Sequence, residues 1–274
     1  MSETESQGPE SKLSDRAQKF IHRLYRDPRY LLIGKVERFG RDLLAFVEAC
    51  TIISSTGEVR GQALINSEFE VRGRPDGERP YEEDSLVDYY HSQEGKAAGA
   101  LGDDEFLALR EESWQFYVRR NFAFLLGDYA RARDDAEHNL AIYNLLEHSE
   151  ISDEMKWSYL RWWPWIERDR AVAQALLNLD HGQPEEAATE LYRVRGAIGQ
   201  YGDRHREQYA QEEEEGKTFC GQMSQQVADL VEVLQEDDAL PVSMEQQLDE
   251  AAARGDQDEV ERLRREMIRR AMGE

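Results

Sequence analysis

Apolar residues recur every three or four positions over most of the chain, which is the period of an α-helix with one buried face. In residues 12–53 this spacing predicts two helices. Ser14 caps the first, and the break falls at Pro28 because proline disfavours the α conformation in the residue before it. Residues 54–80 are rich in glycine and proline, so we expect a loop with one small hairpin there. Residues 81–91 predict a short helix.

The helical period resumes after Asp103, where it is interrupted by glycine and proline turns. The predicted helices are 105–126, 129–146, 153–180, one from Glu185 that ends at Gly199 or Gly202, 219–235, and a hairpin over 244–272 that turns at Gly255. Pro164 either kinks or restarts the helix in which it lies. We therefore expect an all-α fold with a small loop or hairpin insertion.

Changes in composition divide the chain into four predicted parts. These are a disordered tail (1–11), an N-terminal helical region with a Gly/Pro-rich insertion (12–102), a helical domain (103–236) and a terminal helical hairpin (241–274). The tail is polar and acidic, a composition that does not bury a core.

Two helix pairs share one pattern, in which an apolar helix is followed by a glycine turn and a helix with small residues. It is carried by Gly127, Tyr129, Ala132 and Ala136 in the first pair, and by Ala175, Gly182 and Ala187 in the second. This pattern resembles the tetratricopeptide repeat, which implies a fragment of a right-handed superhelix with a peptide-binding concave groove. The turn glycines lie 55 residues apart, not the roughly 34 of a tandem array. Arg120 stands where the family has a small residue. An irregular helical bundle with Gly-Asp turns is the alternative.

Trp114, Tyr117, Asn121 and Phe124 lie about one turn apart on the first helix of the first pair. The resemblance implies that this face lines the concave groove, with Tyr117 and Asn121 contacting a peptide and Trp114 beside them. The alternative is a buried aromatic seam in which Asn121 is a cap or solvated.

Four tryptophans fall within nine residues: Trp157, Trp162, Trp163 and Trp165. They cannot all face one side of a helix, so some must contact a second surface. Tryptophan near arginine, here Arg161 and Arg168, is typical of interface hot spots. A tryptophan-filled core junction between the two helix pairs is the alternative.

The sequence of the C-terminal hairpin predicts one stripe of apolar or small residues on each helix. The stripe consists of Met244, Leu248, Ala251 and Ala252, then Val260, Leu263 and Met267. With Glu259 and Arg264 it resembles the UVR motif, the helical hairpin of excinuclease subunits B and C and of adaptors in protease and arginine-kinase systems. The resemblance implies protein binding, with Leu248, Leu263, Arg264 and Met267 as candidate contacts. The alternative is a hairpin that caps its own domain.

The charge balance restricts the partners. The chain has 57 acidic and 34 basic residues, a formal net charge of −23, so we expect no direct nucleic-acid binding and no attraction to anionic lipid. No apolar stretch approaches the roughly 18 residues of a membrane helix, and the N-terminus has no signal-peptide core. The two cysteines are distant in sequence, which favours a reduced cytoplasmic protein.

No catalytic motif is recognisable. The chain has no phosphate-binding loop, nucleophile elbow, zinc-spaced cysteines or H-E-x-x-H helix, so we expect no catalytic residues, no metal and no cofactor. Asp135 and His138 give one imperfect half of a di-metal motif, and we expect them to be solvated.

The favoured function is a non-catalytic adaptor or scaffold that binds a protein or peptide. One alternative is an accessory factor of DNA repair or stress-response proteolysis acting through the hairpin. Another is a small-molecule binder or enzyme with a tryptophan-lined pocket. Homo-oligomerisation is left open.

Overall fold

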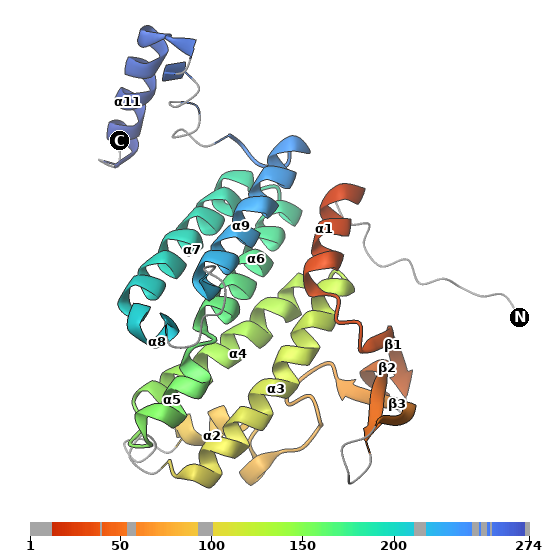
Figure 1. Cartoon of the computed structure of the whole chain (residues 1–274). Coiled ribbons are helices and arrows are strands. Elements are labelled where there is room, and N and C mark those ends of the chain that lie inside the picture. The colour runs from red at the N-terminus through yellow and green to blue at the C-terminus, as the bar shows by residue number, and fades with distance from the viewer. Residues whose placement is uncertain are drawn as a thin grey trace, which may run out of the picture.

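The computed structural model describes residues 13–38, 40–53, 59–92, 101–210, 218–242, 247, 251–252 and 254–271. The predicted disordered tail lies outside them. Helices make up most of this structure, as the helical period predicts, but a three-stranded antiparallel sheet lies beside them, so the all-α expectation is only roughly correct (Figure 1). No helix in these ranges is long and apolar enough to cross a membrane.

The long helices pack as a series of neighbours. The helices are α1 (Asp15–Tyr25), α2 (Leu86–Ser92), α3 (Asp103–Leu125), α4 (Tyr129–Glu147), α5 (Asp153–Leu160), α6 (Trp163–Asp180), α7 (Pro184–Arg204), α8 (Arg206–Ala210), α9 (Phe219–Glu236) and α11 (Gln257–Ala271), with a 3-10 turn at Pro80–Glu82. α3 packs on α4, α4 on α6, α6 on α7 and α7 on α9. α1 lies against both α3 and α9 (Figure 1).

The turns of the two helix pairs have the same geometry. Gly127 and Gly182 both have positive φ, at 71° and 74°, a conformation that favours glycine. The backbone N–H of Asp128 donates to Ala123, and that of Gln183 donates to Asn178, both at 2.8 Å. The glycine turns predicted from the sequence are therefore confirmed as matching helix ends.

Small residues at the contacts let the helices approach closely. Ala132, Ala136, Ala171, Ala175 and Ala187 are fully buried. The same core extends to α1 and α9.

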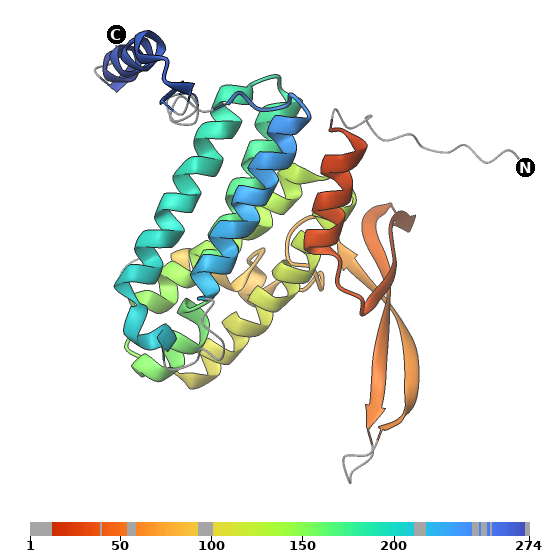
Figure 2. The ribbon, with the colours of Figure 1, turned by 45° about the horizontal axis from the view of Figure 1, so that its top comes forward.

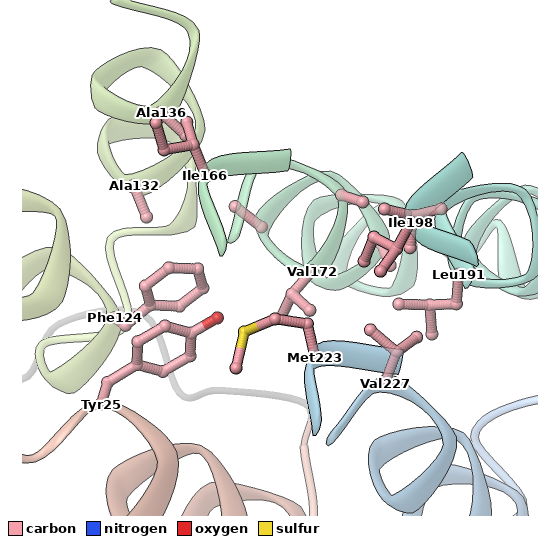
Figure 3. Close-up of a cluster of buried hydrophobic side chains, with 14 of the residues drawn as sticks. Tyr25, Phe124, Ala132, Ala136, Ile166, Val172, Leu191, Ile198, Met223 and Val227 are labelled. Atoms are coloured by element: carbon pink, nitrogen blue, oxygen red, sulfur yellow. The ribbon is translucent and has the colours of Figure 1, made fainter. Parts of the chain in front are cut away.

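Figure 3 shows how α1 joins this core: Tyr25 lies face to face with Phe124 of α3, next to Met223 of α9. The ring centroids of Tyr25 and Phe124 are 3.7 Å apart. α1 therefore shares the core of the helical body with α3 and α9.

The second predicted N-terminal helix is wrong. Its residues form β1 (Tyr30–Arg38) and β2 (Arg41–Ile53), and β3 (Val59–Glu70) completes a sheet of order β1-β2-β3. Arg38 pairs with Arg41, and Gly40 between them has a φ of 72°, which suits a two-residue hairpin turn.

One face of the sheet covers α3. Leu44 and Phe46, two residues apart on β2, are buried with Tyr30 against Phe122 of α3. The Phe46 and Phe122 ring centroids are 4.8 Å apart. The far end of the β2–β3 hairpin projects away from the helices (Figure 2).

Two predictions about helix limits need revision. Pro164 begins α6 after a break, so it restarts the helix and does not kink it. α7 continues through Gly199 and Gly202 to Arg204, because the core contacts of Ile198 and Tyr201 hold this part of the helix. The predicted limits of α9 and α4 are confirmed to within one residue.

α11 stands clear of the helical body in both views (Figures 1 and 2). Gly255 has a φ of 74°, which confirms a turn at this residue, and α11 follows it. Ala251, Val260 and Leu263 form a small core of their own. Most of the first half of the hairpin lies outside the described residues.

Candidate ligand pocket between α3, α5 and α6

A pocket of about 530 Å³ opens between α3, α5 and α6. Its lining consists of Arg110, Glu111, Ser113, Trp114, Tyr117, Arg120, Asn139, Ser158, Tyr159, Trp162, Trp165 and Ile166. The α3 residues fall on one helical face because they are spaced three or four apart. The pocket therefore joins two segments, 110–120 and 158–166, that are about 40 residues apart in sequence.

Aromatic rings form its walls. Trp114 and Tyr117 lie 5.1 Å apart between ring centroids, and Tyr117 meets Trp165 edge to face at 5.6 Å. Trp162 meets Trp165 at 5.9 Å. Trp114 is 44% exposed and Trp162 is 38% exposed, which is unusual for such large apolar side chains and typical of surfaces that bind something.

Hydroxyl groups join α3, α4 and α5 at the base of the pocket. Ser113 and Tyr159 share a hydrogen bond of 2.8 Å between their oxygens, and the Tyr159 hydroxyl donates to the backbone carbonyl of Asn139 at 3.1 Å. Burial raises the pKa of Tyr159 well above its ordinary value. Tyr159 therefore stays neutral at physiological pH and serves as a hydrogen-bonding group.

A buried charge cluster lies next to the pocket, centred on Asp169, which is fully buried. Its Oδ1 accepts hydrogen bonds from the Tyr25 hydroxyl at 3.0 Å and from Arg168 Nε and Nη2 at 2.9 and 2.6 Å. Its Oδ2 lies 2.9 Å from Nε of Arg120. Arg168 also donates to Gln226 of α9, so the cluster links α1, α3, α6 and α9. Burial, with Asp169 close by, raises the pKa of the Tyr25 hydroxyl.

Several buried polar atoms of the lining have no hydrogen-bond partner among the described residues: Arg120 Nη1, Asn139 Oδ1 and Trp165 Nε1. Leaving a buried donor or acceptor unpaired costs about 1–3 kcal/mol. The residues that carry these atoms all line one cavity, so a ligand that reached the unpaired atoms would break no existing hydrogen bond.

The structure brings Trp114, Tyr117, Trp162 and Trp165 together, as a shared binding surface requires. Asn121 is buried, bonds to Tyr117 and is not part of the pocket lining.

The other two candidates of this region, Arg161 and Trp163, are not part of the pocket lining. The Arg161 guanidinium lies over the Trp162 ring at 5.0 Å. Trp163 faces away, stacked on Tyr201 at 4.7 Å. The tryptophan cluster is thus divided between a pocket wall and a core junction.

The hairpin candidates are spread over several environments. Leu263 is buried in the small core of the hairpin, whereas Arg264 is exposed. Met267 belongs to α11, but its side chain lies outside the described residues, as does the whole of Leu248.

Sequence reasoning missed Arg120, Asn139 and Tyr159. A polar residue inside a helical pattern is ordinarily solvated, so nothing marked Asn139 as buried. The sequence does mark Arg120 as unusual, because it stands where the tetratricopeptide pattern has a small inward-facing residue.

The expectation that Asp135 and His138 are solvated is wrong. Asp135 is 1% exposed and accepts two hydrogen bonds from Arg119, at 2.6 and 2.9 Å. Arg119 also donates to the backbone carbonyls of Glu70, the last residue of β3, and of Gly73, and thereby ties the sheet to α3 and α4. Burial raises the pKa of Asp135 despite its guanidinium partner. His138 shares a hydrogen bond of 2.9 Å with the fully buried Glu112.

Within the described ranges, no group of three or more His, Cys, Asp or Glu side chains is placed to hold a metal ion. The geometry provides aromatic walls, a buried guanidinium and unpaired hydrogen-bonding groups. No protein-family model, curated protein or solved structure matches the chain.

Proposed function

We propose that the protein is a non-catalytic adaptor that receives a segment of a protein partner in the pocket between α3, α5 and α6. The single observation that carries this proposal is the wall of half-exposed Trp114 and Trp162 above buried, unpaired polar groups. Tryptophan anchors in a pocket with a polar base are typical of protein-binding hot spots.

The position of α1 shows that the part of α3 beyond the pocket is already covered within the chain. Phe124 lies ten residues after Trp114 on α3, about 15 Å along a helix, and is covered by Tyr25. α1 thus covers α3 around Phe124, whereas the pocket lies along α3 between Arg110 and Arg120. A partner segment seated in the pocket would lie on α3 next to the contact that α1 makes with Phe124.

Selection of peptides from a random displayed library tests this proposal. The immobilised full chain should enrich peptides that bind with micromolar Kd and change its tryptophan fluorescence. The Trp162→Ala variant should lose at least tenfold in affinity, whereas Leu64→Ala, on an exposed residue of β3, should bind as the wild type does. Enrichment of no peptide, or equal binding by the Trp162→Ala variant, would contradict the proposal.

A small-molecule receptor is a second candidate, favoured by the volume of the pocket. About 530 Å³ lies within the usual range for ligand pockets, roughly 300–1,000 Å³. A metabolite screen by thermal shift should then yield a compound that raises the Tm of the wild type and not that of Trp162→Ala. A screen with no such compound removes this candidate.

The remaining expectations stay proposals. The UVR-like resemblance suggests an accessory factor in DNA repair or stress-response proteolysis, and we propose a cytoplasmic location. With a net charge of −23, the purified protein should show no DNA binding in fluorescence anisotropy at physiological salt. Tight, salt-sensitive DNA binding would contradict this expectation.

A further inference from the structure

We propose that the pocket selects ligands that carry a carboxylate next to a flat apolar group, with Arg120 receiving the carboxylate. This inference rests on the proposed function and names the chemistry of the partner segment. The local charge of the pocket supports it. The pocket lining contains Arg110 and Arg120 against Glu111, so it is net positive within a chain of net charge −23.

The buried cluster next to the pocket leaves Arg120 short of a counter-charge. Asp169 supplies one negative charge, and its Oδ1 already accepts Tyr25 and both bonds from Arg168. Arg120 contacts only Oδ2, through Nε, without hydrogen-bond alignment. Two guanidinium groups thus share one carboxylate, and a second carboxylate at the pocket would balance the excess charge.

The unpaired groups of the lining match a carboxylate in hydrogen-bonding type. Arg120 Nη1 and Trp165 Nε1 are donors, and an ionised carboxylate accepts hydrogen bonds and donates none. Asn139 Oδ1 is an acceptor, which suits an amide N–H of the same ligand. A peptide residue with both an N–H and a carboxylate therefore has the polar groups that this pocket lacks.

The aromatic walls determine the rest of the ligand. Trp114 and Trp162 present half-exposed faces, and Tyr117 lies between Trp114 and Trp165. Aromatic and apolar groups pack on such faces in offset or edge-to-face arrangements. We thus expect an aromatic or large apolar side chain against the walls and its carboxylate at Arg120.

A pair of small probes tests the inference on the full chain. The probes are N-acetyl-L-phenylalanine, which is an anion, and N-acetyl-L-phenylalaninamide, which has the same ring and N–H but no charge. Binding is measured by tryptophan fluorescence and ligand-observed NMR. The acid should bind at least tenfold more tightly than the amide, since hydrogen bonds to charged groups are the stronger class.

Two variants assign the effect to its residues. Arg120→Gln should abolish the preference for the acid, whereas Trp162→Ala should weaken both probes equally. Should Arg120→Gln fail to fold, the comparison of acid and amide on the wild type still decides. Leu64→Ala, which alters an exposed residue of β3, is the control.

The outcomes are separable. Equal binding of acid and amide overturns the inference and leaves the aromatic pocket of the proposed function standing. A preference for the acid that persists in folded Arg120→Gln overturns the role of Arg120. Binding of neither probe overturns the inference, and a peptide selection that also enriches nothing overturns the proposed function as well.

Discussion

At the scale of single residues, the helical body is marked by carboxylates that are buried next to a cation or a histidine. Glu112, Asp135 and Asp169 are each at most 1% exposed, and each has a cation or a histidine within hydrogen-bond distance. Removal of one partner from a buried pair is costly because it leaves the other charge uncompensated. These positions should therefore be sensitive to small changes.

The pair Asp134 and Asp135 allows a matched test of this sensitivity. Asp135→Asn should lower the free energy of unfolding by about 3–5 kcal/mol, because Arg119 keeps its buried charge and loses its counter-charge. Asp134→Asn removes the same charge from a side chain that is 45% exposed and should cost less than about 0.5 kcal/mol. Urea denaturation of both variants measures the difference. Equal effects would show that burial is not the cause.

Asp128 provides a test of pH dependence. Burial raises the pKa of its carboxyl, but the Lys35 ammonium and the Arg131 backbone N–H outweigh burial, so the pKa lies below its ordinary value. A carboxylate with a lowered folded-state pKa stabilises the fold above its unfolded pKa, near 3.8. This contribution is lost as the pH falls through the folded-state pKa.

Asp128→Asn should accordingly cost about 0.5–1 kcal/mol at pH 7 and almost nothing at pH 2. Asparagine caps a helix as well as aspartate does, so the substitution removes the charge at the start of α4 and keeps the cap. Denaturation of wild type and variant at both pH values gives the comparison. A difference that stays constant with pH would assign the effect to the cap.

At the scale of elements, glycine has opposite effects in turns and in helices. Gly182 has positive φ and ends α6, whereas Gly196 is exposed within α7 with open space around it. Gly182→Ala should lower the free energy of unfolding by about 1–2 kcal/mol because alanine is strained there. Gly196→Ala should raise it by about 0.5–1 kcal/mol. Thermal unfolding of the two variants should shift Tm in opposite directions; a shift in the same direction would contradict this account.

The helices could be predicted because their ends are marked by local chemistry. Ser14 accepts a hydrogen bond from the N–H of Ala17, and glycines end α3 and α6 at the expected places. The sheet could not be predicted from spacing alone, because Leu32, Val36 and Leu43 happen to fit a helical period as well as a strand. The turn at Gly40, between two β-rich stretches, was the stronger signal.

The candidate site was predictable only as far as its walls. Clustered tryptophans are typical of binding surfaces, so Trp114, Trp162 and Trp165 could be predicted as candidates. The base depends on long-range packing, since Tyr159 and Arg120 belong to segments about 40 residues apart. Sequence spacing does not report which polar residues such packing buries.

At the scale of the whole molecule, α11 belongs to a small core that is distinct from the core of the helical body. The hairpin has its own small core, and Leu240 is the last described residue before it that belongs to the main core. Truncation after Val242 should therefore leave the Tm of the body unchanged to within about 2 °C. Differential scanning calorimetry measures this. A large drop in Tm would mean that the hairpin stabilises the body.

The contact between α1 and α9 has a consequence for folding during synthesis of the protein. Ser14 bonds to Asp237 and Arg16 to Glu236, so the earliest and latest helices of the body meet. Bacterial and eukaryotic ribosomes add about 5–20 residues per second, so the 223 residues between Ser14 and Asp237 take roughly 10–45 s to synthesise. Throughout that interval the surface of α1 that α9 will cover is exposed on every nascent chain. The part of the core between α1 and α9 can therefore be completed only after α9 has been synthesised.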